Sequence, residues 1–129
     1  MGNPMREIIE TQNAPAPIGP YSQAVRVNGF IFVSGQIPVR PATGLVEGED
    51  ITAQTHQVMK NLEAILAAAG KGLDSVVKTT VFLSDLDDFS GFNQVYEKYF
   101  AAVKPARATV QVARLPKNVL LEIEAIAVA

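Results

Sequence analysis

The sequence predicts an α+β fold in which two helices pack on one face of a mixed β-sheet. Three observations lead to this prediction. Strand-like apolar runs occupy both ends of the chain, and each end contains a hairpin-like pair joined by a short turn. Two segments in between carry apolar residues at helical spacing. A further strand separates these helices, so the order is three strands, helix, strand, helix and two strands.

The N-terminal part of the sequence predicts an edge strand, a stiff loop and a hairpin. Residues 7–9 are Glu-Ile-Ile and form the short strand. Residues 13–20 contain three prolines and one glycine, so this segment is an extended loop and neither helix nor central strand. The Asn-Gly pair at 28–29 separates the apolar runs 24–27 and 30–33, which is the strongest short-range signal for a β-hairpin.

The first helix is predicted over residues 51–69, where apolar side chains recur every three to four residues. Asp50 or Thr52 caps its N-terminus. Gly70 suits the left-handed position just beyond its C-terminus. His56 is the single histidine of the sequence, and we expect it on the solvated side of this helix.

The second half of the chain continues with strand, helix and two strands. Residues 75–83 are rich in β-branched residues and predict a strand. Three aspartates stand at the start of a helix over 88–101, where negative charge interacts favourably with the helix dipole. Pro105 ends this helix. Strands 107–113 and 119–128 close the chain.

The last strand has two unlike faces. Its odd-numbered residues are all apolar and should face the helices, because side chains alternate across a strand. Its even-numbered residues place Glu122 and Glu124 among Leu and Ile side chains, which suits neither a core nor a solvated surface. We therefore expect a second, half-buried face that packs against another subunit, with the carboxylates near a crevice.

The preceding strand adds a cation to this picture. Its apolar side chains lie on one side and Arg107 and Thr109 on the other, so we expect these two to share the face of Glu122 and Glu124. A cation and carboxylates in an apolar setting are costly unless they pair with each other or with a ligand. The pattern alone leaves both interpretations open: an ion pair that joins subunits, and a ligand site.

The composition favours an oligomer and a single domain. Of 129 residues, 48% are hydrophobic and only 19% are charged, whereas about 25% is the usual charged fraction. The length predicts one domain over residues 1–129, with residues 1–6 as a flexible N-terminal extension. The surplus of apolar side chains needs more cover than one small domain provides.

Charge and residue types exclude several classes of protein. With 11 basic and 13 acidic residues, the net charge is −2 and no basic patch for nucleic acid or anionic lipid is present. The sequence has no cysteine, so it has no disulfide, thiolate nucleophile or cysteine metal site. No apolar run is long enough for a membrane span, and no signal-peptide pattern occurs. We therefore expect a cytoplasmic protein.

Four stretches together resemble a known family. They are Ile18–Ala24 (IGPYSQA), Val33–Pro38 (VSGQIP), Val77–Leu83 (VKTTVFL), and Pro105–Ala108 (PARA) followed by Arg114–Pro116 (RLP) and Leu121–Ala127 (LEIEAIA). In this order and spacing the sequence is similar to the RidA (YjgF/YER057c/UK114) family of reactive-intermediate deaminases, over about residues 7–128.

The resemblance implies a chorismate-mutase-like fold and a β-barrel-like homotrimer, with clefts between neighbouring subunits. Catalytic members hydrolyse 2-imino acids or their 2-enamine tautomers, such as 2-iminobutanoate and 2-iminopropanoate, to 2-oxo acids and ammonia. Pyridoxal-phosphate enzymes such as threonine dehydratase release these intermediates. The resemblance implies no metal and no organic cofactor.

The resemblance also assigns site residues. Arg107 is the arginine of the Pro-Ala-Arg motif, whose loss generally abolishes activity in the family, and it grips the substrate carboxylate through its planar guanidinium. Glu122 positions the attacking water, and an apolar crevice would raise its pKa toward useful acid–base work. The remaining substrate-binding candidates are Tyr21, Ser34, Gly35, Asn93 and Thr109.

One position departs from the family pattern. Many relatives carry a cysteine two residues after the motif arginine, where this chain has Thr109. A threonine presents the same backbone amide, so deamination should survive, whereas thiol chemistry is excluded there.

Two alternative functions stay open at this point. Some relatives are described as endoribonucleases or translation inhibitors, although the absence of a Lys/Arg cluster argues against a nucleic-acid partner. A trimer that binds 2-oxo acids without turnover is the other alternative.

Overall fold

The computed structural model of the chain describes residues 5–129. The elements are, in chain order, β1 (Glu7–Ile9), β2 (Ala24–Val27), β3 (Phe30–Gln36), α1 (Ile51–Ala68), β4 (Val76–Leu83), α2 (Phe89–Phe100), β5 (Ala106–Gln111) and β6 (Leu121–Val128). Three short 3-10 helices, at Leu73–Ser75, Leu86–Asp88 and Pro116–Asn118, lie between them. Most of the expected N-terminal extension, residues 1–6, lies outside the described residues.

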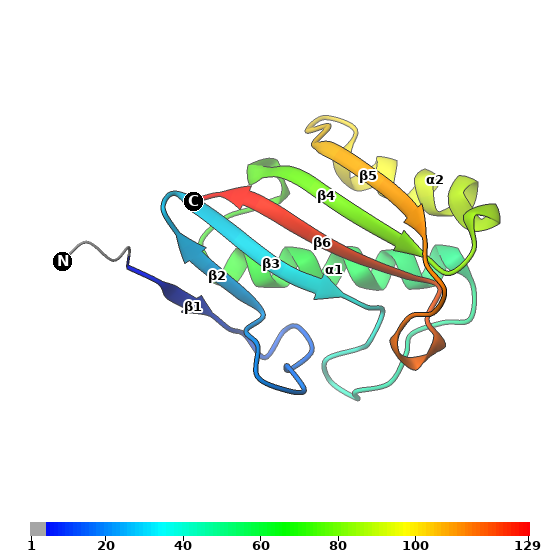
Figure 1. The fold of residues 1–129 in the computed structure, drawn as a ribbon, viewed down its shortest axis with the longest axis horizontal. Coiled ribbons are helices and arrows are strands. Elements are labelled where there is room, and N and C mark those ends of the chain that lie inside the picture. The colour runs from blue at the N-terminus through cyan, green and yellow to red at the C-terminus, as the bar shows by residue number, and fades with distance from the viewer. Residues whose placement is uncertain (1–4) are drawn as a thin grey trace.

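Within the described residues, the strands form one six-stranded sheet in the order β1-β2-β3-β6-β4-β5. Every pairing is antiparallel except that of β4 with β5, which α2 connects as a crossover. Figure 1 shows both helices behind the sheet, on the same face. The predicted α+β fold, with two helices on one face of a mixed sheet, is confirmed.

Local signals placed most elements correctly. Asn28 and Gly29 have φ values of 52° and 83°, as a type I′ hairpin turn requires. The Asp50 side chain caps α1 by accepting a hydrogen bond from Ala53 N at 2.8 Å. Gly70 follows the helix with φ 76°, in the left-handed region.

Helix α2 spans Phe89–Phe100, within one residue of the predicted 88–101 at each end, and the chain then turns through Lys104 with φ 51°. Two strand boundaries near the C-terminus differ more from the prediction. Strand β6 begins two residues late, since Leu120 N donates to the side-chain Oε1 of Gln54. Strand β5 ends at Gln111, two residues earlier than expected.

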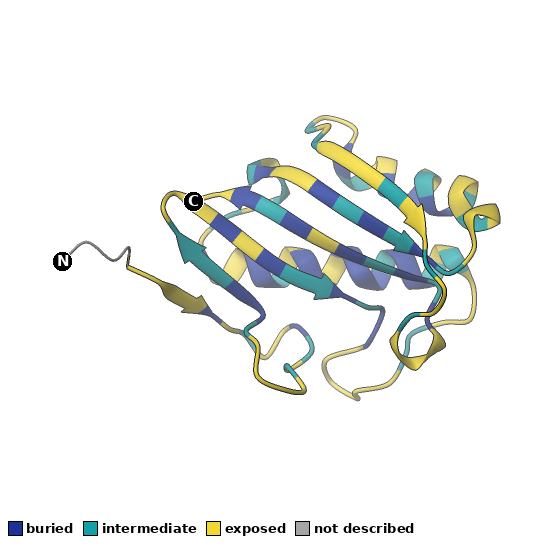
Figure 2. Cartoon of the chain, viewed as in Figure 1, coloured by how far each residue is buried: buried dark blue, intermediate teal, exposed yellow. Residues whose placement is uncertain are grey.

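The core lies between the sheet and the helices. The odd-numbered residues of β6 from Leu121 to Ala127 are all buried, as the alternation predicted. They pack with the apolar faces of α1 and α2, including the fully buried Leu62 and Phe92. Figure 2 shows the resulting alternation of buried and exposed residues along the central strands.

The opposite face of the sheet is also largely apolar, and no element of the described chain covers it. We call it the open face. Its apolar members, assigned by strand register, are Ile8, Val25, Val27, Phe30, Phe32, Phe82, Val110, Ile126 and Val128. Phe30 and Phe32 are 43% and 45% exposed. An apolar sheet face of this kind marks an interaction surface. No helix of the described chain is long and apolar enough to cross a membrane.

A buried amide joins α1 to two other segments and yields a first prediction. Gln54 accepts from Leu120 N at 2.8 Å and donates to Gly48 O at 3.1 Å. Replacing Gln54 by Ala leaves both backbone groups without partners, so the free energy of unfolding should fall by about 1–3 kcal/mol. Urea unfolding measures the change, and Gln94→Ala on the exposed side of α2 is the control. Equal stabilities of the two variants would contradict the anchoring role.

Candidate functional site

An irregularity in strand β3 shapes one half of the candidate site. The strand pairs with β6 as far as Val33 and again at Gln36, and the register shifts in between. A bulge of this kind re-aims side chains. A Cβ atom on Gly35 would collide with the Glu122 carboxylate. A side chain at this position would displace the Glu122 carboxylate, so glycine lets the carboxylate lie against the backbone.

Glu122 is a half-buried carboxylate on the open face. It pairs across the sheet with Phe82. Burial raises the pKa of its carboxyl, and the nearby Glu124 carboxylate raises it further. Among the described residues, none forms a hydrogen bond or an ion pair with it. The group can therefore hold a water molecule and take up a proton.

Ser34 directly precedes Gly35, against which this carboxylate lies, and hydrogen bonds link Ser34 to the segment that carries Tyr21. The Ser34 hydroxyl donates to Ser22 O at 2.6 Å, and its backbone N donates to Gln23 O at 2.9 Å. The Tyr21 ring is 54% exposed, and its hydroxyl accepts from Ile18 N at 3.4 Å. Ser34 thus fixes the segment that presents Tyr21, and both oxygens keep lone pairs for a ligand.

Gln23 organises the proline-rich loop, a role that the sequence analysis did not assign. Its side chain is 2% exposed. It donates to the carbonyls of Thr11, Ala14 and Pro15 at 3.0, 3.3 and 2.8 Å, and accepts from Thr11 N at 2.7 Å. The only signal in the sequence is a glutamine that stands between the loop and an apolar strand.

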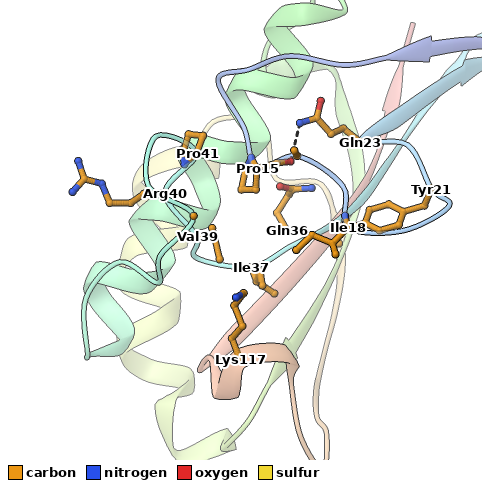
Figure 3. Close-up of a pocket in the computed structure, with 13 residues that line it drawn as sticks. Pro15, Ile18, Tyr21, Gln23, Gln36, Ile37, Val39, Arg40, Pro41 and Lys117 are labelled. Carbon is orange, nitrogen blue, oxygen red and sulfur yellow. Dashed lines mark hydrogen bonds between the residues drawn. The ribbon is translucent and has the colours of Figure 1, made fainter.

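A pocket of about 300 Å³ opens beside this half of the site, and we call it the loop pocket (Figure 3). Its walls come from the proline-rich loop and from the segment after β3, and include Pro15, Ile18, Tyr21, Gly35, Ile37 and Val39. Lys117, from the connection between β5 and β6, reaches it from a third side. Gly35 both lines this pocket and contacts the Glu122 carboxylate.

The second half of the site is built around Arg107 on β5. Its guanidinium donates to Asn93 Oδ1 at 2.7 Å. Its central carbon lies 4.8, 5.4 and 5.8 Å from the ring centroids of Tyr96, Phe89 and Phe92 on α2. The rings back the cation and Asn93 fixes its plane. No carboxylate of the described chain forms an ion pair with it, so its outer nitrogens can grip a ligand.

The expectation that Arg107 and Thr109 share a face with Glu122 and Glu124 is wrong. Arg107 pairs in register with Thr79, which is fully buried beneath the helices. Residues in register lie on the same side of a sheet, so Arg107 and Thr109 are on the helix side. Glu122 and Glu124 are on the open face. The sheet separates the two halves within one chain.

Thr109 lies where its backbone can serve a ligand. Strand β5 is at one end of the sheet, so its outer edge has no strand partner in the described chain. Val112 N donates to Leu83 O of β4 at 2.9 Å. Backbone N–H groups alternate in direction along a strand, so that of Thr109 points to the free edge.

The comparisons with known proteins identify the family. The family model described as Endoribonuclease L-PSP matches residues 11–129, nearly the whole chain. The chain belongs to the RidA family.

Three relatives in the RidA family are similar to this chain over nearly their whole length. A RutC family protein of Pyrococcus horikoshii is 56% identical, covering 95% of this chain and 98% of that protein. A 2-iminobutanoate/2-iminopropanoate deaminase of Salmonella typhimurium is 53% identical, covering 96% and 98%. The crystal structure of E. coli TdcF with bound serine has a TM-score of 0.91 at 50% identity, covering 95% and 98%. The predicted resemblance is confirmed.

Outside these two halves, His56 and the acidic side chains are the remaining candidates for chemistry in the described part of this RidA-family chain. His56 is half-buried rather than free in solvent, because its Nδ1 lies 2.8 Å from the Tyr99 hydroxyl. No three histidine or acidic side chains of residues 5–129 converge to hold a metal ion. The chemistry-bearing groups of the described residues are therefore the two halves around Glu122 and Arg107.

The raised pKa of Glu122 predicts how stability depends on pH. Between the ordinary glutamate pKa of the unfolded chain and the raised pKa of the native one, the native state holds the proton more strongly. Stability therefore falls as pH rises through this window. Glu122→Gln removes this loss, so its melting temperature should exceed that of wild type at neutral pH. The difference should vanish below the ordinary glutamate pKa.

Thermal unfolding across pH 3–8 tests this, with the exposed Glu10→Gln as control. A Glu122→Gln variant that is less stable than wild type at neutral pH would contradict the prediction. It would mean that a cation from another chain lies against this carboxylate in the assembled protein.

Proposed function

We propose that this chain hydrolyses 2-imino acids, or their 2-enamine tautomers, to 2-oxo acids and ammonia. One observation carries the proposal: the chain holds an unpaired, oriented guanidinium on one side of its sheet and an unpaired, half-buried carboxylate on the other. Two such groups fit the two ends of a small molecule that has a carboxylate next to an imine carbon.

Arg107 supplies the grip on the substrate carboxylate. The guanidinium fork matches a carboxylate with two parallel hydrogen bonds, which an ammonium group cannot do. Asn93 and the aromatic rings of α2 hold the fork before the substrate arrives. The outward N–H of Thr109 adds a further donor to the same group. Pre-orientation reduces the entropy that binding costs.

Glu122 supplies the water. The carboxylate takes a proton from water as the water oxygen bonds to the imine carbon, which gives a tetrahedral carbinolamine. Glu122 returns this proton to the nitrogen, which completes the neutral carbinolamine. The proton of the carbinolamine hydroxyl then moves by way of the Glu122 carboxylate to the nitrogen as the C–N bond breaks, so that ammonia leaves and the hydroxyl becomes the carbonyl of the 2-oxo acid. The elevated pKa of Glu122 makes the carboxylate a stronger base than a solvated glutamate. In this proposal Ser34, which precedes Gly35, and Tyr21, which lines the loop pocket together with Gly35, contact the substrate or the water.

The two halves belong to one site only if neighbouring copies meet. A substrate of a few carbon atoms cannot reach from the open face to the helix face of one sheet. Arg107 is on the edge strand, where it can project beyond its own chain toward the open face of another. We propose a homotrimer in which each site joins Arg107, Asn93 and Thr109 of one subunit to Glu122 and its neighbours from the next.

The relatives support this reading of the site. One relative of 53% identity is named a 2-iminobutanoate/2-iminopropanoate deaminase. Small substrates of this kind fit a site in which an arginine binds the carboxylate and a glutamate holds the water. The source of such imines would be pyridoxal-phosphate-dependent dehydratases. The family model carries the name Endoribonuclease L-PSP. Binding of RNA phosphates normally needs a cluster of basic residues, which this sequence of net charge −2 does not have.

The first test removes the grip. Threonine dehydratase generates 2-iminobutanoate, and formation of 2-oxobutanoate is followed with and without the protein. Arg107→Ala should lower kcat/KM by at least about 30-fold, since truncating one partner of a charge-assisted pair costs about 2–5 kcal/mol or more. Arg107→Lys should recover only part of the activity. The exposed Lys60→Ala is the control.

The outcomes of this test separate the alternatives. No acceleration by wild type overturns the deaminase assignment, and binding of 2-oxobutanoate without acceleration selects the non-catalytic trimer. RNA cleavage that follows the protein through purification and disappears in Arg107→Ala would select the nuclease. An Arg107→Ala variant as fast as wild type would remove Arg107 from the site.

The second test asks whether the site spans two chains. Arg107→Ala and Glu122→Ala are each expected to be inactive alone. Unfolding and refolding an equal mixture should restore about a quarter of wild-type activity, because about a quarter of the subunit contacts then join an intact Arg107 to an intact Glu122. Sedimentation shows whether mixed oligomers have formed. Mixed oligomers without any recovered activity would contradict a shared site.

A further inference from the structure

The proposed site gives roles to Arg107, which binds the substrate carboxylate, and to Glu122, which holds the water. It gives no role to the loop pocket near Glu122. Gly35 lines this pocket, and the Glu122 carboxylate lies against the backbone of the same residue. The reacting carbon of a 2-imino acid carries three groups: the carboxylate, the nitrogen and the side chain. With the carboxylate on Arg107 and the water on Glu122, the side chain still needs a place.

The walls of the loop pocket suit an apolar stem. Pro15, Ile18, Ile37 and Val39 present hydrocarbon, and Val39 is almost fully buried. The volume of about 300 Å³ is at the small end of ligand sites. It admits side chains larger than the methyl and ethyl groups of the smallest imino acids.

Of the amide and charged side chains that line the pocket, only Lys117 has no partner within the described residues. Gln23 is bonded to the proline-rich loop, and Gln36 donates to Ser34 O at 3.1 Å. Arg40 forms an ion pair with Glu47 at 3.0 Å. Lys117 forms no ion pair within the described chain.

Lys117 is held so that its charge reaches the pocket. Its backbone has φ 56°, inside the short 3-10 helix that precedes β6. Figure 3 shows its side chain directed toward Ile37, with the ammonium group at the pocket. An exposed lysine can keep its charge hydrated when a neutral chain enters. It attracts an anionic end of a side chain and repels a cationic one.

We propose that the loop pocket receives the substrate's side chain and that Lys117 determines which side-chain ends are accepted. Imino acids with an apolar stem and a neutral or anionic end are substrates, whereas those with a cationic end are rejected. This inference rests on the proposed deaminase function, and it adds to it the substrate class and a residue that sets specificity.

The experiment compares three imines made in the assay by amino acid oxidases from leucine, glutamate and arginine. Formation of each 2-oxo acid is measured against the spontaneous rate. Wild type should show kcat/KM for the leucine and glutamate imines at least about tenfold above that for the arginine imine, the expected effect of one nearby charge. Lys117→Glu should reverse the order of the glutamate and arginine imines. The leucine imine should change by less than about threefold, because its side chain carries no charge.

Two further variants make the result specific. Lys117→Met should abolish the difference between charged ends and keep the activity on the leucine imine. Lys60→Glu makes the same charge change on the exposed side of α1 and should leave all three ratios unchanged.

The contrary outcomes are distinct. If Lys117→Glu shifts all three substrates equally, or shifts none, the pocket does not take the side chain and the proposal is overturned, while the deaminase function stands. If Lys60→Glu reproduces the reversal, net charge and not the pocket sets the preference. If wild type accelerates none of the imines, the proposed function is overturned and this proposal with it.

Discussion

A single sheet with apolar side chains on both faces is the constraint on which the rest of the molecule depends. The helices cover one face and leave phenylalanines such as Phe30 and Phe32 about half exposed on the other. Apolar surface gains about 25 cal/mol for each Å² removed from water, so this face favours contact with another surface. Glu122 lies within that face, and a partner that covers the face must also satisfy its carboxylate. Assembly and chemistry are coupled for this reason.

Two departures from regular sheet structure carry the reactive groups. The bulge before Gln36 lets the Glu122 carboxylate approach the backbone of Gly35. At one edge of the sheet, β5 has a free side, and α2 supplies the rings and the amide that orient Arg107. Regular central strands would bury such groups or bond them to neighbours. The irregular places therefore leave them free to meet a ligand.

Sequence patterns predicted the features that a few neighbouring residues control. They failed where the pairing of strands far apart in the sequence determines which face a residue occupies. The Asn28-Gly29 turn and the Asp50 cap act over a few residues, so their elements were predicted well. The face of Arg107 was assigned wrongly, because Ala108 and Val110 were taken as core residues. Because both faces of this edge strand are largely exposed, its alternation of apolar and polar residues does not indicate which face lies against the helices. The parallel register with β4 decides it, and that register depends on α2.

The buried amides were equally invisible in the sequence, and they give the site its rigidity. Gln23, Gln54 and Asn61 are each at most 5% exposed and bond to the backbone of loops. Asn61 donates to the carbonyls of Ile37 and Val39, two residues of the loop pocket. A loop without regular hydrogen bonds would collapse into the pocket or move, and ordering it would reduce the binding energy. Because these amides replace the missing backbone partners, the walls of the pocket are held in place without a ligand, and the proposed selectivity would depend on these fixed walls rather than on closure around the substrate.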